Sequence, residues 1–148
     1  MDAIDRRILA CLKENARANA TEIGSRISLS TSAVIERIKK LESSGIIKGY
    51  TVLVDEKLTG TELTAFINVR LDHPKYYENF VSVIKSESCV TECYYIAGDF
   101  DFILKTIVRS GKTLEDILNS IKSIHGVSLT RTSVVLSTNK RDVSVLPE

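Results

Sequence analysis

The sequence predicts an α+β protein: an N-terminal helix-turn-helix domain, winged-helix-like, followed by a C-terminal ferredoxin-like βαββαβ sandwich. Three observations predict this. The first 45 residues have the apolar period of helices, the period changes to two after Gly45, and strand and helix patterns then follow in the order βαββαβ. We expect the helix-turn-helix domain over residues 1–50, an extended linker over 51–62, and the ferredoxin-like domain over 63–148.

The first 45 residues predict three helices. Ile4, Ile8 and Leu12 recur every four residues and mark the apolar stripe of the first helix. Asn19 followed by Glu22 resembles a capping box and begins a short helix of about residues 20–27, in which Gly24 would let another helix pack closely.

The third helix follows a Leu-Ser turn. Ser30 is a suitable N-cap, and Gly45 is a natural stop after the last turn. Val34, Ile38 and Leu41 mark its buried face. A helix, a short helix, a tight turn and a helix within about 45 residues is the pattern of a helix-turn-helix unit.

The second half begins with a half-buried strand, in which Leu63 to Leu71 alternate between apolar and mostly polar residues. A helix carrying Tyr77, Phe80 and Ile84 follows. The remaining elements are a strand over 89–97, a turn over 98–101, a strand over 102–109, a helix over 114–124 and a strand over 126–137.

Both helices of this half should cover one face of a four-stranded antiparallel sheet. Side chains such as Ile67, Tyr95 and Val135 suggest that the other face is not fully polar. An apolar sheet face of that size usually has a partner, so we expect dimerisation through the sheets.

The composition is that of a soluble globular protein, with 43% hydrophobic and 26% charged residues and a net charge of +1. The chain has no apolar run of the ~20 residues that span a bilayer, and its first residues do not form a signal peptide. We therefore expect a cytoplasmic protein without a membrane partner. Residues 1–55 carry nine basic and seven acidic residues, which is weak support for a nucleic-acid partner.

No pattern of residues indicates an enzyme, a metal site or a cofactor. The sequence lacks a phosphate-binding loop, a Gly-x-Ser-x-Gly motif and a metal-spaced cluster. Cys11, Cys89 and Cys93 are expected to be reduced, and we interpret them as small buried apolar residues.

Together these segments resemble the Lrp/AsnC family of transcriptional regulators, the feast/famine proteins, over nearly the whole chain. The resemblance rests on IDRRILACLKENAR, LSTSAVIERIKKLESSGIIKGY, AGDFDFILK and His125-Gly126-Val127. It implies a regulator that binds double-stranded DNA as a homodimer or as an octamer. It also implies a small-molecule effector, usually an amino acid, which modulates assembly and DNA binding.

The expected DNA-binding residues lie on the third helix, whose N-terminal residues would meet base edges in the major groove. They are Ser30, Thr31, Ser32, Ala33, Glu36, Arg37, Lys39 and Lys40. The three cations are expected to contact phosphate. Taken singly, Lys39 and Lys40 fit a solvated helix face equally well, Arg37 could instead pair with Glu42, and Glu36 could pair with Lys40.

The resemblance also places an effector site at the turn Gly98-Asp99-Phe100-Asp101, between subunits and close to part of the last strand. The residues carried over are Gly98, Asp99, Asp101, Thr130, Thr132 and Ser133. Asp101 is our expected partner for the ammonium group of an amino acid. Without the resemblance, glycine and aspartate in a turn need no function beyond shaping it.

A second hypothesis stays open from the sequence. The chain could be a ligand-binding or oligomerisation module whose N-terminal helices bind a protein rather than DNA. The two hypotheses differ in salt dependence, because a DNA complex weakens steeply as salt rises.

Overall fold

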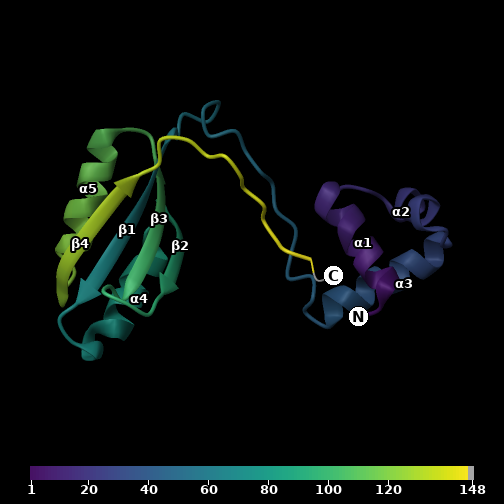
Figure 1. The fold of residues 1–148 in the computed structure, drawn as a ribbon, viewed down its shortest axis with the longest axis horizontal. Coiled ribbons are helices and arrows are strands. Elements are labelled where there is room, and N and C mark those ends of the chain that lie inside the picture. Colours follow the sequence, from purple (N-terminus) through teal and green to yellow (C-terminus); the bar gives the residue numbers. More distant parts are fainter. Residues whose placement is uncertain (147–148) are drawn as a thin grey trace. The chain divides into compact units, whose positions relative to one another are not determined.

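The computed structural model describes residues 1–146, which form two compact units (Figure 1). The first unit contains Met1–Leu53 together with the end of the chain from Lys140, and the second contains Val54–Asn139. The boundary near Leu53 falls in the segment expected to be extended. Residues 140–146, which the sequence boundaries placed with the second domain, belong to the first unit.

The first unit is built from three helices: α1 (Ala3–Glu14), α2 (Ala20–Ile27) and α3 (Thr31–Ser43). Each helix contributes to one apolar core, whose buried members are Ile8, Cys11, Ile23, Ile27, Val34 and Leu41. Of the apolar positions that gave the sequence its helical period, Ile8, Val34 and Leu41 belong to this set. The others, Ile4, Leu12 and Ile38, are partly buried and pack against it. The described part of this unit contains no strand.

Side-chain caps begin all three helices. Asn19 accepts a hydrogen bond from the Glu22 N–H at 2.9 Å while the Glu22 carboxylate accepts one from the Asn19 N–H at 3.0 Å, which confirms the expected capping box. The Ser30 hydroxyl caps α3, as expected. A second capping box, between Asp2 and Asp5, begins α1 and was not anticipated from the sequence.

Gly24 allows the chain to turn tightly between α2 and α3. The helix ends at Ile27 and its C-cap residue, Ser28, has φ 60°. The Leu29 N–H donates back to the Gly24 carbonyl at 2.9 Å. A Cβ atom on Gly24 would lie 2.5 Å from the Leu29 carbonyl oxygen. The close neighbour is therefore the backbone of the turn, whereas the sequence had suggested a second helix.

The second unit has the expected βαββαβ order with one extra 3₁₀ turn. Its elements are β1 (Leu63–Leu71), η1 (Pro74–Tyr76), α4 (Tyr77–Ser86), β2 (Val90–Tyr95), β3 (Phe102–Val108), α5 (Gly111–Lys122) and β4 (Val127–Val134). The four strands form an antiparallel sheet in the order β2-β3-β1-β4. This arrangement confirms the predicted ferredoxin-like sandwich, although β4 ends three residues earlier than expected.

One face of this sheet is covered by α4 and α5 (Figure 1). The alternation predicted for β1 is confirmed, since Ala65, Ile67 and Val69 are fully buried on this face. They pack with residues of β3, α4 and α5, including Leu104 and Phe80, in a single core.

The other face, here called the open sheet face, carries apolar side chains that neither helix covers. Cross-strand pairing places Phe66, Ile103 and Ile107 of the central strands on it, with Tyr94 and Leu129 on the outer strands. Tyr94 is 54% exposed and Leu129 is 42% exposed, while the other three are half-buried.

The sequence prediction named the wrong residues for this apolar face. Ile67 lies in the helix-covered core, and Tyr95 packs its ring against Tyr77 and Phe102. Val135 follows the end of β4. The open face is apolar, as predicted, but other residues form it. Along each strand these residues alternate with the residues of the core.

The cysteines differ in their environments. Cys11 is buried and Cys89 half-buried, whereas Cys93 is exposed, so our interpretation of all three as buried residues was wrong for Cys93. Among the described residues, no group of three or more His, Cys, Asp or Glu side chains is placed to hold a metal ion. No helix in residues 1–146 is both long and apolar enough to cross a membrane.

Candidate nucleic-acid interface and ligand site

The N-terminus of α3 carries a group of hydroxyl side chains. Ser30 accepts a hydrogen bond from the Ala33 N–H at 3.2 Å, and its hydroxyl lies 3.2 Å from that of Ser32. The Thr31 hydroxyl lies 3.3 Å from that of Thr21 on α2. These side chains hold the turn and the start of α3 together, and the partial positive charge of the helix N-terminus is added to their polarity.

One face of α3 is exposed along its length. Ser32, Glu36 and Lys39 recur at intervals of four and three residues, so they share this face, opposite the buried Val34 and Leu41. We call Ser32, Glu36 and Lys39 the exposed face of α3.

The exposed charges of α3 are unpaired within the described chain. Glu36, Lys39 and Lys40 form no ion pair among residues 1–146, so the Glu36–Lys40 pair considered from the sequence does not form. Lys39 and Lys40 are therefore available to meet an anion.

Arg37 is different from these two lysines. Its Nη1 atom lies 2.7 Å from a carboxylate oxygen of Asp2 and 2.7 Å from one of Asp5, both at the start of α1. These hydrogen bonds raise the pKa of the guanidinium, and that of Asp2 contributes most. The alternative partner proposed from the sequence, Glu42, instead accepts a hydrogen bond from the Tyr50 hydroxyl at 2.9 Å.

The expected ligand-site residues start with the turn between β2 and β3. Gly98 has φ 138° and is exposed, as is Asp99. Asp101 is half-buried, and one of its carboxylate oxygens accepts a hydrogen bond from the Leu71 N–H at 2.7 Å. One carboxylate oxygen of Asp101 therefore holds the turn against the end of β1, and the other is left for a further partner.

The structure predicts a difference in stability between the two acids of this turn. Replacing Asp101 with Ala would leave the Leu71 N–H without its acceptor, which should lower the free energy of unfolding by about 1–2 kcal/mol. Replacing the exposed Asp99 with Ala should change it by less than about 0.5 kcal/mol. Urea unfolding of the full chain checks both values, and equal effects would contradict this role for Asp101.

The three expected residues of β4 do not share one face. Thr130 pairs with Val69 and Thr132 with Ile67, so both lie on the helix-covered side and are half-buried. Ser133 pairs with Phe66 and lies on the open sheet face. The three residues therefore cannot line one surface of a single strand, because adjacent residues alternate between faces.

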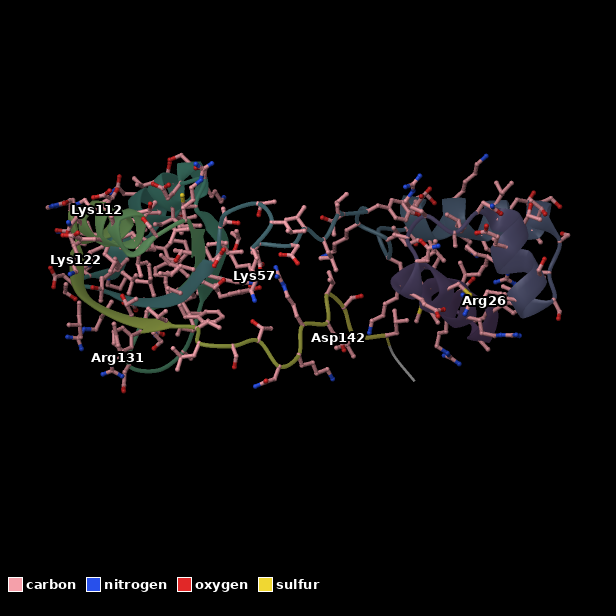
Figure 2. All side chains as sticks on the ribbon, turned by 90° about the horizontal axis from the view of Figure 1, so that it is seen from above. Arg26, Lys57, Lys112, Lys122, Arg131 and Asp142 are labelled. Atoms are coloured by element: carbon pink, nitrogen blue, oxygen red, sulfur yellow. The ribbon has the colours of Figure 1, made fainter. Side chains whose placement is uncertain are left out.

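A different contact joins the turn to β4. The guanidinium carbon of Arg131 lies 5.0 Å from the centre of the Phe100 ring, within the range of a cation–π interaction. Phe100 is buried, and Figure 2 shows Arg131 on the side of the sheet away from Lys112 and Lys122 of α5. The turn and the last strand thus meet on the side of the open sheet face.

Sequence reasoning missed four residues of these sites: Asp2, Asp5, Phe100 and Arg131. Asp2 and Asp5 have the same spacing as Asn19 and Glu22, so the same capping rule could have found them. No comparable signal exists for the Phe100–Arg131 contact, because it depends on how the turn folds across the end of β1.

Two family models match the chain and follow the two halves of the fold. An AsnC-type helix-turn-helix domain matches residues 1–42, and an Lrp/AsnC ligand binding domain matches residues 64–145. The first match contains α1, α2 and nearly all of α3. The second begins within β1 and contains both the Gly98–Asp101 turn and β4.

Relatives of known name and structure cover almost the whole chain. The HTH-type transcriptional regulator FL11 of Pyrococcus abyssi is 36% identical over 140 residues, which are 95% of this chain and 92% of FL11. A transcriptional regulator of Neisseria meningitidis, solved in complex with L-methionine, is 29% identical with a TM-score of 0.94, covering 98% and 96% of the two chains. A feast or famine regulatory protein of M. tuberculosis, also complexed with L-methionine, is 32% identical with a TM-score of 0.91, covering 99% of each chain.

Proposed function

Because the chain belongs to the Lrp/AsnC family of transcriptional regulators, we propose that it binds specific sequences of double-stranded DNA as a homodimer and that a small effector, an amino acid, modulates this binding. The observation that carries the proposal is the exposed face of α3, which follows a capped N-terminus rich in hydroxyl groups. A recognition helix of this kind enters the major groove with its N-terminal residues at the base edges.

The side chains of α3 suit different parts of a DNA site. Thr31, Ser32 and Ala33 can meet base edges, because hydroxyl groups bond to acceptors and methyl groups contact thymine. Lys39 and Lys40 lie about two turns further along and can meet phosphates, which position the helix without reading the sequence. The Ser30 hydroxyl holds the helix start, so we assign it a supporting role.

Selection of bound duplexes from a random pool tests the DNA-binding function of the full chain. We expect enrichment of a two-fold symmetric sequence, here called the selected duplex, with half-sites about one helical turn apart. Its affinity should fall steeply as salt rises. If no sequence is enriched and salt has little effect, the alternative applies and the N-terminal helices bind a protein.

Glu36 should limit the affinity for random DNA. It lies between Ser32 and Lys39 on the exposed face of α3 and has no cation partner there, so its charge repels phosphate. Glu36→Gln should tighten binding to random DNA by about fivefold at low salt, since two unit charges ~4 Å apart in water interact by about 1 kcal/mol. The affinity can be measured by fluorescence anisotropy.

The matched control for this prediction is Glu62→Gln, which makes the same charge change at an exposed position of the second unit. It should leave the affinity nearly unchanged. If Glu36→Gln has no effect or weakens the binding, this side of α3 does not face DNA.

We place the effector at the turn Gly98–Asp101, together with residues of β4 and the same region of a second subunit. The exposed backbone of this turn can donate to the carboxylate of an amino acid, and an aspartate of the turn can accept from its ammonium group. The relatives solved with L-methionine support the choice of ligand class. Because Asp101 keeps only part of its carboxylate free, Asp99 is a second candidate for the ammonium group.

A ligand held between subunits would act by favouring one assembly over another. DNA affinity then changes because the spacing of the recognition helices changes. Sedimentation and binding of the selected duplex should be measured with each amino acid in turn. The effector proposal fails if no amino acid alters either measurement, and DNA binding without an effector would then remain.

The open sheet face is our proposed dimer surface. Phe66, Ile103 and Ile107 form its centre, with the Lys105–Glu92 ion pair, 2.8 Å long, beside them. The Lys105 side chain is only 15% exposed, and its charge is paired with that of Glu92. A two-fold axis through the face would bring the same apolar residues of both subunits together.

A further inference from the structure

Arg37 is the one cation of α3 with carboxylate partners in the described chain, and both partners belong to a different helix. Its position on α3 is between Val34 and Leu41, three and four residues away, both of which are buried in the core shared with α1. Arg37 therefore lies at the edge of the buried stripe, and its side chain is 31% exposed. It is not a member of the exposed face of α3.

The two carboxylates that hold Arg37 are themselves fixed by the backbone. One oxygen of Asp2 accepts the Asp5 N–H at 2.8 Å, and one oxygen of Asp5 accepts the Asp2 N–H at 2.9 Å. The remaining oxygen of each carboxylate accepts from Arg37 Nη1. The capping box thus leaves two acceptors in set positions, and a single guanidinium nitrogen bonds to both.

We propose that Arg37 is a positioning residue, which fixes the orientation of α3 against the start of α1, and that it does not contact DNA phosphate. This inference rests on the proposed DNA-binding function. Arg37 with its two carboxylates carries a net charge of −1, so this group repels a phosphate. A phosphate would also have to displace two charge-assisted hydrogen bonds to reach the guanidinium.

The ion pairs persist over the pH range in which DNA binding is measured. The backbone hydrogen bond from Asp5 and then the Arg37 guanidinium lower the pKa of Asp2 from 3.8 to about 2. A carboxyl group whose pKa is lowered on folding stabilises the folded state above its unfolded pKa. That contribution is lost only as the pH falls from about 4 to about 2.

The consequence is that the acids of α1 should affect DNA binding through Arg37. Asp5→Asn removes a negative charge, which by simple electrostatics should tighten binding to DNA. If Asp5 holds Arg37 in place, the same change should weaken binding to the selected duplex. The sign of this effect separates the positioning role from a simple charge effect.

The test uses three full-length variants: Arg37→Gln, Asp5→Asn and the double variant. The affinity of each is measured for the selected duplex and for random DNA over a range of salt concentrations. We expect each single variant to lose about tenfold in affinity for the selected duplex, as one impaired base contact would cost. We expect little loss on random DNA and an unchanged salt slope. The double variant should be no worse than either single one, because both changes break the same link.

Lys39→Gln is the matched control, since it removes one cation from the exposed face of α3. Its salt slope should fall by about 0.9 for each phosphate that the lysine no longer neutralises. If Arg37→Gln lowers the slope as Lys39→Gln does, or if Asp5→Asn tightens binding to the selected duplex, the positioning role is wrong while the DNA-binding function stands. If the unmodified protein selects no duplex, both proposals fail.

Discussion

Replacing Ile103 with Asp should dissociate the proposed dimer into monomers. Ile103 lies on the central strand β3 and faces the open side of the sheet, where neither α4 nor α5 covers it. A side chain of this size contributes about 1.5 kcal/mol or more to the free energy of association when it is fully buried. In a two-fold symmetric dimer each substitution occurs twice in the interface. The dimer dissociation constant should therefore rise by about two orders of magnitude or more. Analytical ultracentrifugation over a concentration series measures this directly.

Ser120→Asp is the matched control for this prediction. It adds the same charge to the same unit, but at an exposed position on α5, in the helix layer. The dimer should persist in this variant. If Ile103→Asp remains dimeric and Ser120→Asp dissociates, the interface lies on the helix layer and our assignment of the open sheet face is wrong.

Replacing Gly24 with Ala should destabilise the helix-turn-helix unit and distort its turn. The added Cβ would lie 2.5 Å from the Leu29 carbonyl oxygen, and this neighbour is backbone, which cannot rotate away as a side chain can. Overpacking of this kind costs about 1–3 kcal/mol, and the displaced turn is the one that sets the angle between α2 and α3. Urea unfolding should show the loss of stability, and specific DNA binding should be lost with it.

Gly49→Ala provides the comparison within the same unit. A Cβ atom at Gly49 would meet no heavy atom within 4 Å, so this change should alter stability by less than about 0.5 kcal/mol. If Gly24→Ala is as stable as Gly49→Ala and still binds the selected duplex, the tight turn does not require glycine at position 24.

Local patterns of the sequence were sufficient to predict the fold. The helical spacing of Ile8 and Val34, the capping box at Asn19 and the alternation along β1 all depend on neighbours within a few residues. Such signals survive in a sequence because the side chains that share a core face recur at fixed intervals. The βαββαβ order then follows from their succession, and the structure agrees with it.

The sites were less predictable because they depend on contacts between distant residues. Arg37 bonds to Asp2 and Asp5, more than 30 residues away, and nothing in the helical spacing of α3 reveals this. Strand alternation alone places Ser133 opposite Thr130 and Thr132, but the pairing of β4 with β1 decides which face the helices cover. Register and long-range ion pairs are tertiary properties, so single-sequence patterns leave them open.

Reading of DNA by α3 is tested by one titration. The affinity of the full chain for the selected duplex and for a scrambled duplex of equal length should be measured from low to high salt. We expect tighter binding to the selected duplex throughout and a linear fall of log affinity with log salt for both. Equal affinities for the two duplexes, or an affinity that does not change with salt, would show that α3 does not read DNA.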